Sequence, residues 1–509
     1  MRVFLKCQTF EYDVHSLVKA FYPLENVKIE NEPDSDESGC FYMVETSPEE
    51  VPGPDSDELY SGELKVSYYK DRVCYKEEIG IAQNLDRADL KNLMKRTIYT
   101  LLSNVKEMTL PWGTLTGIRP CKIPMKLMEE GQDNDAIYNY MKETYMVSDE
   151  KIALSTEIAA LEKKVIARTS GDKGYSLYVG IPFCPTRCMY CSFTSYPITK
   201  YGDKVMEYLG ALMKEISFVA NEFRGKQLDS VYIGGGTPTS ISAEHLLVLI
   251  TFIKDSFDFS TVKEFTVEAG RPDSITRDKL EVLKNLGVTR ISINPQTMNQ
   301  KTLDIIGRRH TTEQIKEAFA LAREVGFDNI NMDIILGLPG EGADEVNTTL
   351  SEIEKMRPDS LTVHSMAIKR AANMAGYLAE HPEMESINTP EIMEMAADAA
   401  NRMGMKPYYL YRQKNMSGNF ENVGYAVCET DSCADIMGRS EPYSTGKEGI
   451  YNILIMEEVQ TIVACGAGTV TKRVYGDGRI ERCDTVKDVD LYISKIDEMI
   501  DRKRQLFKD

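Results

Sequence analysis

Three cysteines lie close together in the chain, at Cys184, Cys188 and Cys191, with the spacing CxxxCxxC. Thiolates on one short loop can each bind one iron of a [4Fe–4S] cubane, which leaves the fourth iron free to take a small molecule. Structural zinc is the alternative, but it takes four protein ligands, and the sequence offers no further cysteine or histidine nearby. The spacing therefore favours an iron–sulfur cluster with one open iron over a zinc site.

A glycine run follows the cysteines by one strand-like segment. Gly234, Gly235 and Gly236 precede Thr237 at the end of SVYIGGG. Three residues without a Cβ let the backbone approach a ligand closely, although a lone glycine run is more often a tight turn. Its position shortly after the cysteine loop favours a role in ligand binding.

Polar side chains accompany the next strand-like segments. Glu268 ends the third, Gln296 ends the fourth, Arg308 follows in IIGRRH, and Asp333 lies in the fifth. A single acid on a strand is usually a capping or solvated residue. Polar groups on consecutive strands are more typical of a shared pocket.

The elements that must position these residues form a regular series. β-like runs alternate with helical patterns, which predicts parallel β/α units and a barrel or partial barrel. In such barrels the chemistry lies at the carboxyl ends of the strands. The six runs are SLYVGIP near 177, SVYIGGG near 231, EFTVEAG near 265, RISINPQ near 291, INMDIILGLPG near 331 and SLTVHSM near 361.

The remaining sequence predicts two flanking regions. Residues 1–170 mix strand and helix patterns with acidic loops, which indicates an N-terminal α+β domain. We expect the barrel over 171–380 and a C-terminal α/β extension covering the substrate over 381–509.

Composition limits the function classes. The chain has 509 residues, a net charge of −19 and 11 cysteines. An acidic chain is a poor general binder of nucleic acid, which needs a basic surface. No apolar run approaches the length of a membrane span, and we find no signal peptide, so we expect a cytoplasmic protein with reduced thiols.

The segment YVGIPFCPTRCMYCSF resembles the signature of radical S-adenosylmethionine enzymes, specifically the coproporphyrinogen dehydrogenase group. The resemblance implies a partial (β/α)6 TIM-like barrel, a [4Fe–4S] cluster and S-adenosylmethionine bound to its open iron. In that family the cofactor is cleaved to a 5′-deoxyadenosyl radical that abstracts a substrate hydrogen. Cys184, Cys188 and Cys191 are then the catalytic cluster ligands.

The same resemblance assigns a cofactor pocket. GGGTPT is similar to the motif that receives the methionine end of the cofactor, and the spacing from Gln296 to Arg308 to Asp333 matches cofactor-contacting residues of the family. Carboxylates there bind ribose hydroxyls or nearby groups, and the arginine binds the cofactor carboxylate. The implied pocket residues are Tyr178, Tyr190, Phe193, Gly235, Gly236, Thr237, Glu268, Gln296, Arg308 and Asp333.

A narrower resemblance covers nearly the whole chain. PWGTLTGIRP, PYYLYRQKNMSGNFENVGYA and YNILIMEEVQTIVACGAG look like the HemZ-like branch of the family. It implies oxidative decarboxylation of two propionates of coproporphyrinogen III to vinyls, giving protoporphyrinogen IX, with electrons from a donor such as flavodoxin or ferredoxin.

Two departures keep other functions open. Phe193 stands where the family's dehydrogenases carry a further cysteine, and Tyr451 stands where related haem chaperones carry a haem-binding histidine. A haem-binding or haem-trafficking protein that retains the cluster is one alternative. Another radical reaction on a tetrapyrrole is the second.

A tetracarboxylate substrate needs cations, and arginine forks suit carboxylates. Surface solubility is the default interpretation of each candidate cation, and core packing is the default for the nearby tyrosines Tyr408, Tyr409 and Tyr411. The pair Cys428 and Cys433 offers only two thiols for a second metal site. The candidate cations are Arg309, Lys369, Arg370, Arg412 and Lys414.

Overall fold

The computed structural model covers the 509-residue chain. It describes all residues except 7–8, 24, 33–38, 50, 54–55, 118, 368–372, 385, 414–415, 417–418, 429–445 and 509. The chain folds into two compact units. One comprises Met1–Glu157 with Arg412–Asn415, and the other comprises Ile158–Tyr411 with Met416–Asp509.

The N-terminal unit is an α+β fold, as predicted. Its described strands form a 5-stranded sheet in the order β2-β1-β3-β4-β5, and α1 and α2 bury their apolar sides against it. Its strands are β1 (Arg2–Leu5), β2 (Lys28–Glu30), β3 (Cys40–Ser47), β4 (Tyr60–Lys70) and β5 (Val73–Leu85). Its helices are α1 (Glu11–Phe21), α2 (Arg87–Lys106), α3 (Lys122–Glu129) and α4 (Asn134–Tyr145), and α5 (Asp149–Ile166) continues into the second unit.

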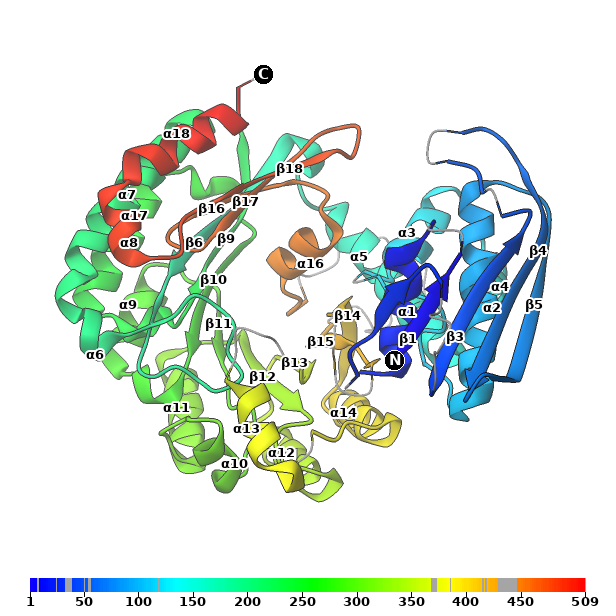
Figure 1. Ribbon diagram of the computed structural model, residues 1–509. Coiled ribbons are helices and arrows are strands. Elements are labelled where there is room, and N and C mark those ends of the chain that lie inside the picture. The colour runs from blue at the N-terminus through cyan, green and yellow to red at the C-terminus, as the bar shows by residue number, and fades with distance from the viewer. Residues whose placement is uncertain are drawn as a thin grey trace, which may run out of the picture. The chain divides into compact units, whose positions relative to one another are not determined.

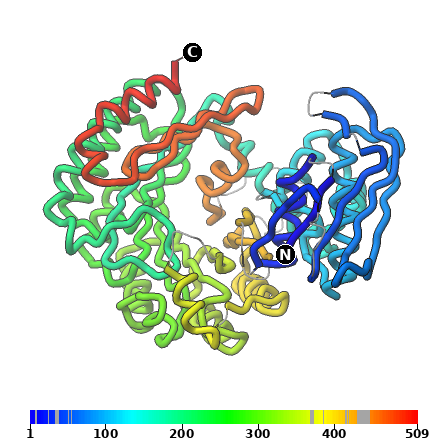
Figure 2. The backbone as a smooth tube through the Cα atoms, viewed as in Figure 1, coloured from blue at the N-terminus to red at the C-terminus, as the bar shows by residue number. Residues whose placement is uncertain are grey.

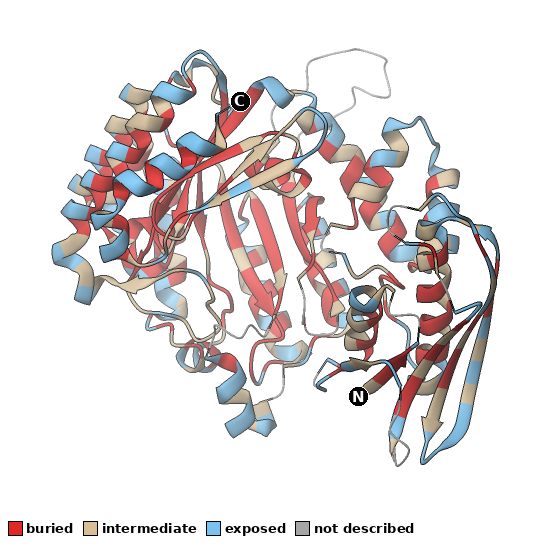
Figure 3. Ribbon diagram, turned by 45° about the horizontal axis from the view of Figure 1, so that its top comes forward, coloured by how far each residue is buried: buried red, intermediate tan, exposed pale blue. Residues whose placement is uncertain are grey.

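The second unit is built on parallel strands that match the six predicted runs. They are β6 (Gly174–Ile181), β9 (Gln227–Gly235), β10 (Glu264–Gly270), β11 (Arg290–Ile293), β12 (Ile330–Leu336) and β13 (Ser360–Ser365). Neighbours in this series pair in chain order, each parallel to the next. Figure 3 colours these strands mostly red for buried, with the exposed sides of the surrounding helices pale blue. Buried strands under a helical layer are typical of parallel sheets.

Helices on the outside connect these strands, as Figure 1 shows. The described helices of this unit are α6 (Ile198–Tyr201), α7 (Val205–Glu222), α8 (Ala243–Ser256), α9 (Arg277–Asn285), α10 (Gln300–Ile305), α11 (Thr312–Val325), α12 (Ala343–Met356), α13 (Met374–Glu380), α14 (Pro390–Arg402), α16 (Ile450–Glu457), α17 (Val489–Ser494) and α18 (Ile496–Leu506). The short strands β7 (Phe183–Cys184) and β8 (Tyr196–Pro197) pair with each other around the cysteine loop.

The C-terminal region extends the sheet at both edges, which the sequence did not predict. β15 (Asn422–Val427) pairs antiparallel with β13 and carries β14 (Met405–Tyr411). β16 (Thr461–Cys465) adds parallel to β6, followed by β17 (Val470–Val474) and β18 (Ile480–Asp484). The described strands thus form an 11-stranded open sheet with β14 and β18 at its edges. A partial barrel rather than a closed one is the result.

The observed units differ from the expected domains. The first unit ends at Glu157 rather than near residue 170, and residues 381–411 and 416–509 fall in the same unit as the barrel strands. The last helical segment is divided at Lys495 into α17 and α18. The three-domain division stays a prediction.

A buried ion pair fastens the last helix to the barrel. Figure 2 shows α18 as the red end of the tube along the green helices. Lys503 of α18 forms an ion pair with Glu215 of α7, and both side chains are fully buried. Glu215 Oε2 also accepts from the Tyr492 hydroxyl at 2.6 Å and from the Gly466 backbone N–H at 2.8 Å. These partners satisfy a carboxylate that could not otherwise stay charged in the core.

We expect Lys503→Met to lower the free energy of unfolding by about 3–5 kcal/mol, because it leaves the Glu215 carboxylate buried without its cation. Urea denaturation followed by circular dichroism measures the change. The neighbouring pair of Lys214 and Asp497 lies at the surface, at 2.5 Å, with side chains 52% and 77% exposed. Lys214→Met is therefore the matched control and should cost less than about 1 kcal/mol. Equal losses in the two variants would contradict the expectation.

Candidate active site

The cysteine loop begins where β6 ends. Cys184 is buried, and Cys188 and Cys191 are half-buried. The loop turns tightly, since the Cys191 N–H donates to the Cys188 carbonyl at 3.1 Å. Burial raises the pKa of the Cys184 thiol to about 11, against a lowering hydrogen bond from Thr237, and burial also raises the pKa of Cys191. A metal that binds these two thiols has to displace their protons.

The arrangement of the loop bears on the zinc alternative. Among the described residues, no three His, Cys, Asp or Glu side chains are grouped to hold a single metal ion. A zinc site needs its ligands converging on one ion. A cubane instead takes each thiolate on a different iron, so its ligands lie farther apart.

The glycine run is locked against the cysteine loop. The Gly236 N–H donates to the Ile181 carbonyl at 2.8 Å, and the Thr237 N–H donates to the Phe183 carbonyl at 2.7 Å. A Cβ at Gly236 would lie 2.5 Å from the Phe183 oxygen and 2.9 Å from Cys184 Sγ. Glycine is required there because the backbone of β9 touches the cysteine loop itself.

Glu268 near the end of β10 is paired with a tyrosine. The Tyr232 hydroxyl donates to Glu268 Oε1 at 2.7 Å. Burial, with the Asp333 carboxylate nearby, raises the pKa of Glu268 to about 7, although the Tyr232 hydrogen bond opposes the rise. A carboxyl group with a raised pKa is typical of functional pockets.

Gln296, three residues beyond the end of β11, lies beside Asp333 of β12. The Gln296 N–H donates to the Asp333 carbonyl at 2.9 Å, and Gln296 adopts a positive φ of 66°. Gln296 Oε1 is buried and has no hydrogen-bond partner in the described part of the chain. Asp333 lies in the middle of β12, where its carboxylate accepts from Asn331 at 2.6 Å and lies 3.8 Å from His364 Nε2. A buried amide oxygen without a partner is suited to receive a polar ligand.

Arg308 reaches the cysteine loop from the segment after α10. It is buried, and it donates to the Asn294 carbonyl at 2.5 Å and to the Tyr190 hydroxyl at 3.1 Å. Its Nε has no hydrogen-bond partner among the described residues. The structure thus brings the predicted residues Tyr190 and Arg308 together.

Tyr178 and Phe193 have different surroundings. Tyr178 stacks on Tyr232 and Tyr451 with ring centroids 5.9 and 6.0 Å apart, and Tyr232 and Tyr451 are 4.5 Å apart. The stack joins β6, β9 and α16. Phe193 is 68% exposed, and its place in the pocket stays a prediction.

Sequence reasoning missed a second arginine at the cysteine loop. Arg271 directly follows β10 and is 3% exposed. Its Nη1 donates to the Thr186 hydroxyl at 2.7 Å and lies 3.8 Å from Cys188 Sγ. An arginine directly after a strand whose end carries Glu268 was the available signal. Tyr232 and Tyr451 were missed too, because stacking across three elements leaves no local pattern.

The predicted substrate-binding cations divide into three groups. Arg309 is exposed. Arg412 belongs to the N-terminal unit, where it donates to the Leu115 carbonyl at 2.6 Å and lies over the Trp112 ring. Lys369, Arg370 and Lys414 lie outside the described residues.

Tyr408 and Tyr409 are buried in an apolar cluster, as core packing predicts. Cys433, of the cysteine pair considered for a second metal site, lies outside the described residues.

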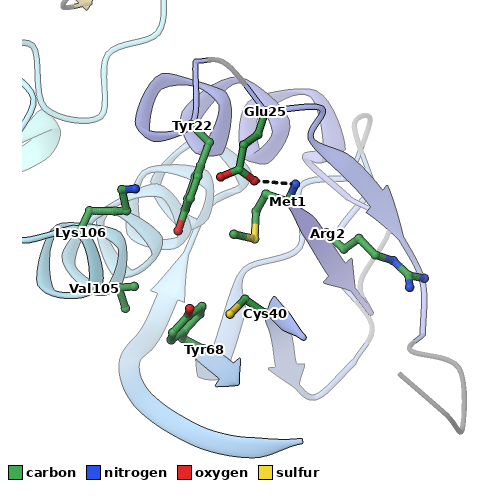
Figure 4. A pocket seen from close by; sticks show the side chains of 8 residues that line it. All are labelled: Met1, Arg2, Tyr22, Glu25, Cys40, Tyr68, Val105 and Lys106. Atoms are coloured by element: carbon green, nitrogen blue, oxygen red, sulfur yellow. Dashed lines mark ion pairs between the residues drawn. The ribbon is translucent and has the colours of Figure 1, made fainter. Parts of the chain in front are cut away.

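The N-terminal unit contains a pocket of about 520 Å³. Figure 4 shows the Met1 thioether and the Cys40 thiol in it, with the Met1 amino group paired to Glu25 at 2.9 Å. Its lining is Met1, Arg2, Tyr22, Glu25, Cys40, Tyr68, Val105 and Lys106, which includes no predicted site residue.

Comparison with known proteins agrees with the predicted fold and family. Residues 178–353 match the Radical SAM superfamily. The chain is 38% identical over 448 residues to the oxygen-independent coproporphyrinogen-III oxidase-like protein HemZ of Bacillus subtilis, covering 87% of this chain and 86% of that protein. It is 37% identical over 198 residues to the haem chaperone HemW of Bacillus subtilis, covering 38% of this chain and 51% of the chaperone.

A solved structure of coproporphyrinogen III oxidase (HemN) from Escherichia coli is also similar, with a TM-score of 0.49 and 22% identity, over 67% of this chain and 73% of that chain. The chain belongs to the radical S-adenosylmethionine superfamily and, within it, to the HemZ-like branch of the oxygen-independent coproporphyrinogen III oxidase family. Membership implies S-adenosylmethionine and a [4Fe–4S] cluster. No described helix is long and apolar enough to cross a membrane.

We expect Glu268→Gln to remove a pH dependence from the stability of the cluster-free chain. A carboxyl group whose pKa rises from 4.5 to about 7 on folding binds its proton more tightly in the folded state. The stability that it contributes is therefore lost as the pH rises from about 4.5 to 7, by roughly 3 kcal/mol in all. Urea denaturation between pH 5 and 8 (about one unit per step) measures this.

The free energy of unfolding of the parent should fall over that range while that of Glu268→Gln stays level, so the variant gains stability relative to the parent as the pH rises. Glu317→Gln, at an exposed position on α11, is the control and should follow the parent. Parallel curves for Glu268→Gln and the parent would mean that Glu268 titrates as an ordinary carboxyl group.

Proposed function

We propose that this chain is an oxygen-independent coproporphyrinogen III dehydrogenase of porphyrin and haem biosynthesis. The observation that carries the proposal is the chain-long similarity, at 38% identity, to a relative named as a coproporphyrinogen-III oxidase-like protein. In the reaction each of two propionate side chains loses CO2, one hydrogen atom, which the cofactor-derived radical takes up, and one electron, which passes to an electron acceptor, and becomes a vinyl group, giving protoporphyrinogen IX. We place the protein in the cytoplasm and expect a reducing partner such as flavodoxin or ferredoxin.

Cys184, Cys188 and Cys191 would hold the cluster, with one iron left for S-adenosylmethionine. The surroundings fit this group, because the three cysteines lie buried or half-buried on one short loop and because Gln296 Oε1 and Arg308 Nε are buried without partners in the described chain. When bound, the two cofactors supply a radical that abstracts hydrogen.

The chain's own residues orient and shield the S-adenosylmethionine. In the proposal the carboxylates of Glu268 and Asp333 accept hydrogen bonds from ribose hydroxyls, and Arg308 binds the carboxylate. Tyr232 holds the Glu268 carboxylate in place through its 2.7 Å hydrogen bond. Tyr178, Tyr190, Phe193, Gly235, Gly236, Thr237 and Gln296 complete the proposed pocket.

Anaerobic reconstitution tests the proposal. With reductant and S-adenosylmethionine, the full chain should convert coproporphyrinogen III to protoporphyrinogen IX, as followed by chromatography and mass spectrometry against a panel of porphyrinogens. Cofactor cleavage with an unchanged tetrapyrrole would overturn the substrate assignment. A product of another mass would favour a different radical reaction on the ring.

We expect Cys188→Ala to lower bound iron from about four atoms per chain to fewer than one and to abolish turnover, since three thiolates are needed for a cubane with one open iron. Iron analysis and the absorbance of the cluster measure the loss. Cys74→Ala, at an exposed cysteine of the N-terminal unit, is the matched control and should retain both. Retention of a full cluster by Cys188→Ala would remove Cys188 from the ligand set.

Haem binding is the second candidate, favoured by the similarity to a haem chaperone over 198 residues. It predicts stoichiometric haem binding without turnover. A haem titration with no shift of the Soret band would reject it. The surroundings of Tyr451 speak against it, since that side chain is 5% exposed and packs on the rings of Tyr178 and Tyr232.

A further inference from the structure

Arg271 occupies a position between the cysteine loop and the loop that follows β10. Asp273 fixes one side of its guanidinium, with Nε to Oδ1 at 2.9 Å and Nη2 to Oδ2 at 2.6 Å. The other side donates to Thr186 through the carbonyl at 3.1 Å and the hydroxyl at 2.7 Å. A planar fork with fixed donors suits such two-sided contact better than a lysine would.

The same guanidinium donates to a proposed cluster ligand, with Arg271 Nη1 lying 3.8 Å from Cys188 Sγ. Arg271 is 3% exposed, so its charge is weakly screened by solvent. The Asp273 side chain is 20% exposed and partly offsets that charge from the side away from the sulfur.

The cysteine loop is also held by hydrogen bonds that do not involve the guanidinium of Arg271. The Met189 N–H donates to the Ile306 carbonyl at 3.0 Å, and the Thr186 hydroxyl donates to the Gly307 carbonyl at 3.1 Å. Arg308 also binds the Tyr190 hydroxyl. These contacts hold the loop in place independently of Arg271.

Reduction adds one negative charge to an iron–sulfur cluster. Hydrogen bonds to the sulfurs and the net charge nearby set the reduction potential, because they stabilise the more negative state. We propose that Arg271 is a positioning residue that raises the reduction potential of the cluster through its N–H donation and positive charge at Cys188. This inference rests on the proposed cluster at Cys184, Cys188 and Cys191.

Potentiometric titration of the reconstituted full chain, read by electron paramagnetic resonance, tests the inference. At the midpoint potential of the parent, Arg271→Met should lower the ratio of reduced to oxidised cluster at least tenfold, a shift of about 59 mV for one electron. Arg271→Lys keeps the charge and should stay within threefold of the parent. Asp273→Asn removes the offsetting charge and should raise the ratio.

The opposite directions of Arg271→Met and Asp273→Asn separate charge from simple disruption, which would move both the same way. Arg323→Met is the matched control, because Arg323 pairs with Asp359 at 2.7 Å and with two backbone carbonyls away from the cysteine loop. It should leave the midpoint unchanged.

The outcomes distinguish this inference from the proposed function. A parent chain that takes up no cluster overturns the proposed function. If the parent holds a cluster and the ratio of reduced to oxidised cluster in Arg271→Met stays within threefold of the parent's, only the role of Arg271 is overturned. If Arg271→Met holds no cluster, Asp273→Asn decides, and an unmoved or lowered midpoint overturns the role.

Discussion

The placement of three cysteines on one short loop, with Cys184 buried and Cys188 and Cys191 half-buried, is the constraint on which the site depends. Three thiolates so close together need compensating positive charge, from a metal and from groups around the loop. Arg271 and Arg308 supply such groups. Arg271 directly follows strand β10, and Arg308 lies in the segment after helix α10. The barrel is what makes this possible, because parallel strands place their carboxyl ends at one edge of the sheet.

Contacts between the strand ends then determine which residues are tolerated. Gly236 touches the Phe183 carbonyl and Cys184, and Tyr232 fills the space beside Gly234 while binding Glu268. The glycine run therefore allows close packing of the backbone against the cysteine loop, besides any role in ligand binding. A glycine that a sequence motif assigns to a ligand pocket can thus be required by the packing of the fold itself.

Local patterns were sufficient to predict the six parallel strands, since each is a short apolar run between helical periods, and the cysteine spacing indicated the cluster. Local patterns do not predict the pairing of segments that are distant in the sequence. β16 pairs with β6 across nearly three hundred residues, and the residues TIVAC do not indicate which edge of the sheet the strand joins. Arg271 and Tyr451 were missed for the same reason, since their partners come from other strands and helices.

Helix α16 supports the proposed cofactor pocket through a series of contacts. Glu264 at the start of β10 accepts the backbone N–H of Ile450 at 2.5 Å, and the Asn452 amide donates to the Tyr408 hydroxyl at 3.2 Å. These bonds hold Tyr451 against Tyr232, whose hydroxyl holds Glu268. Through Tyr232, the stacking of Tyr451 therefore supports the Glu268 carboxylate of the proposed cofactor pocket.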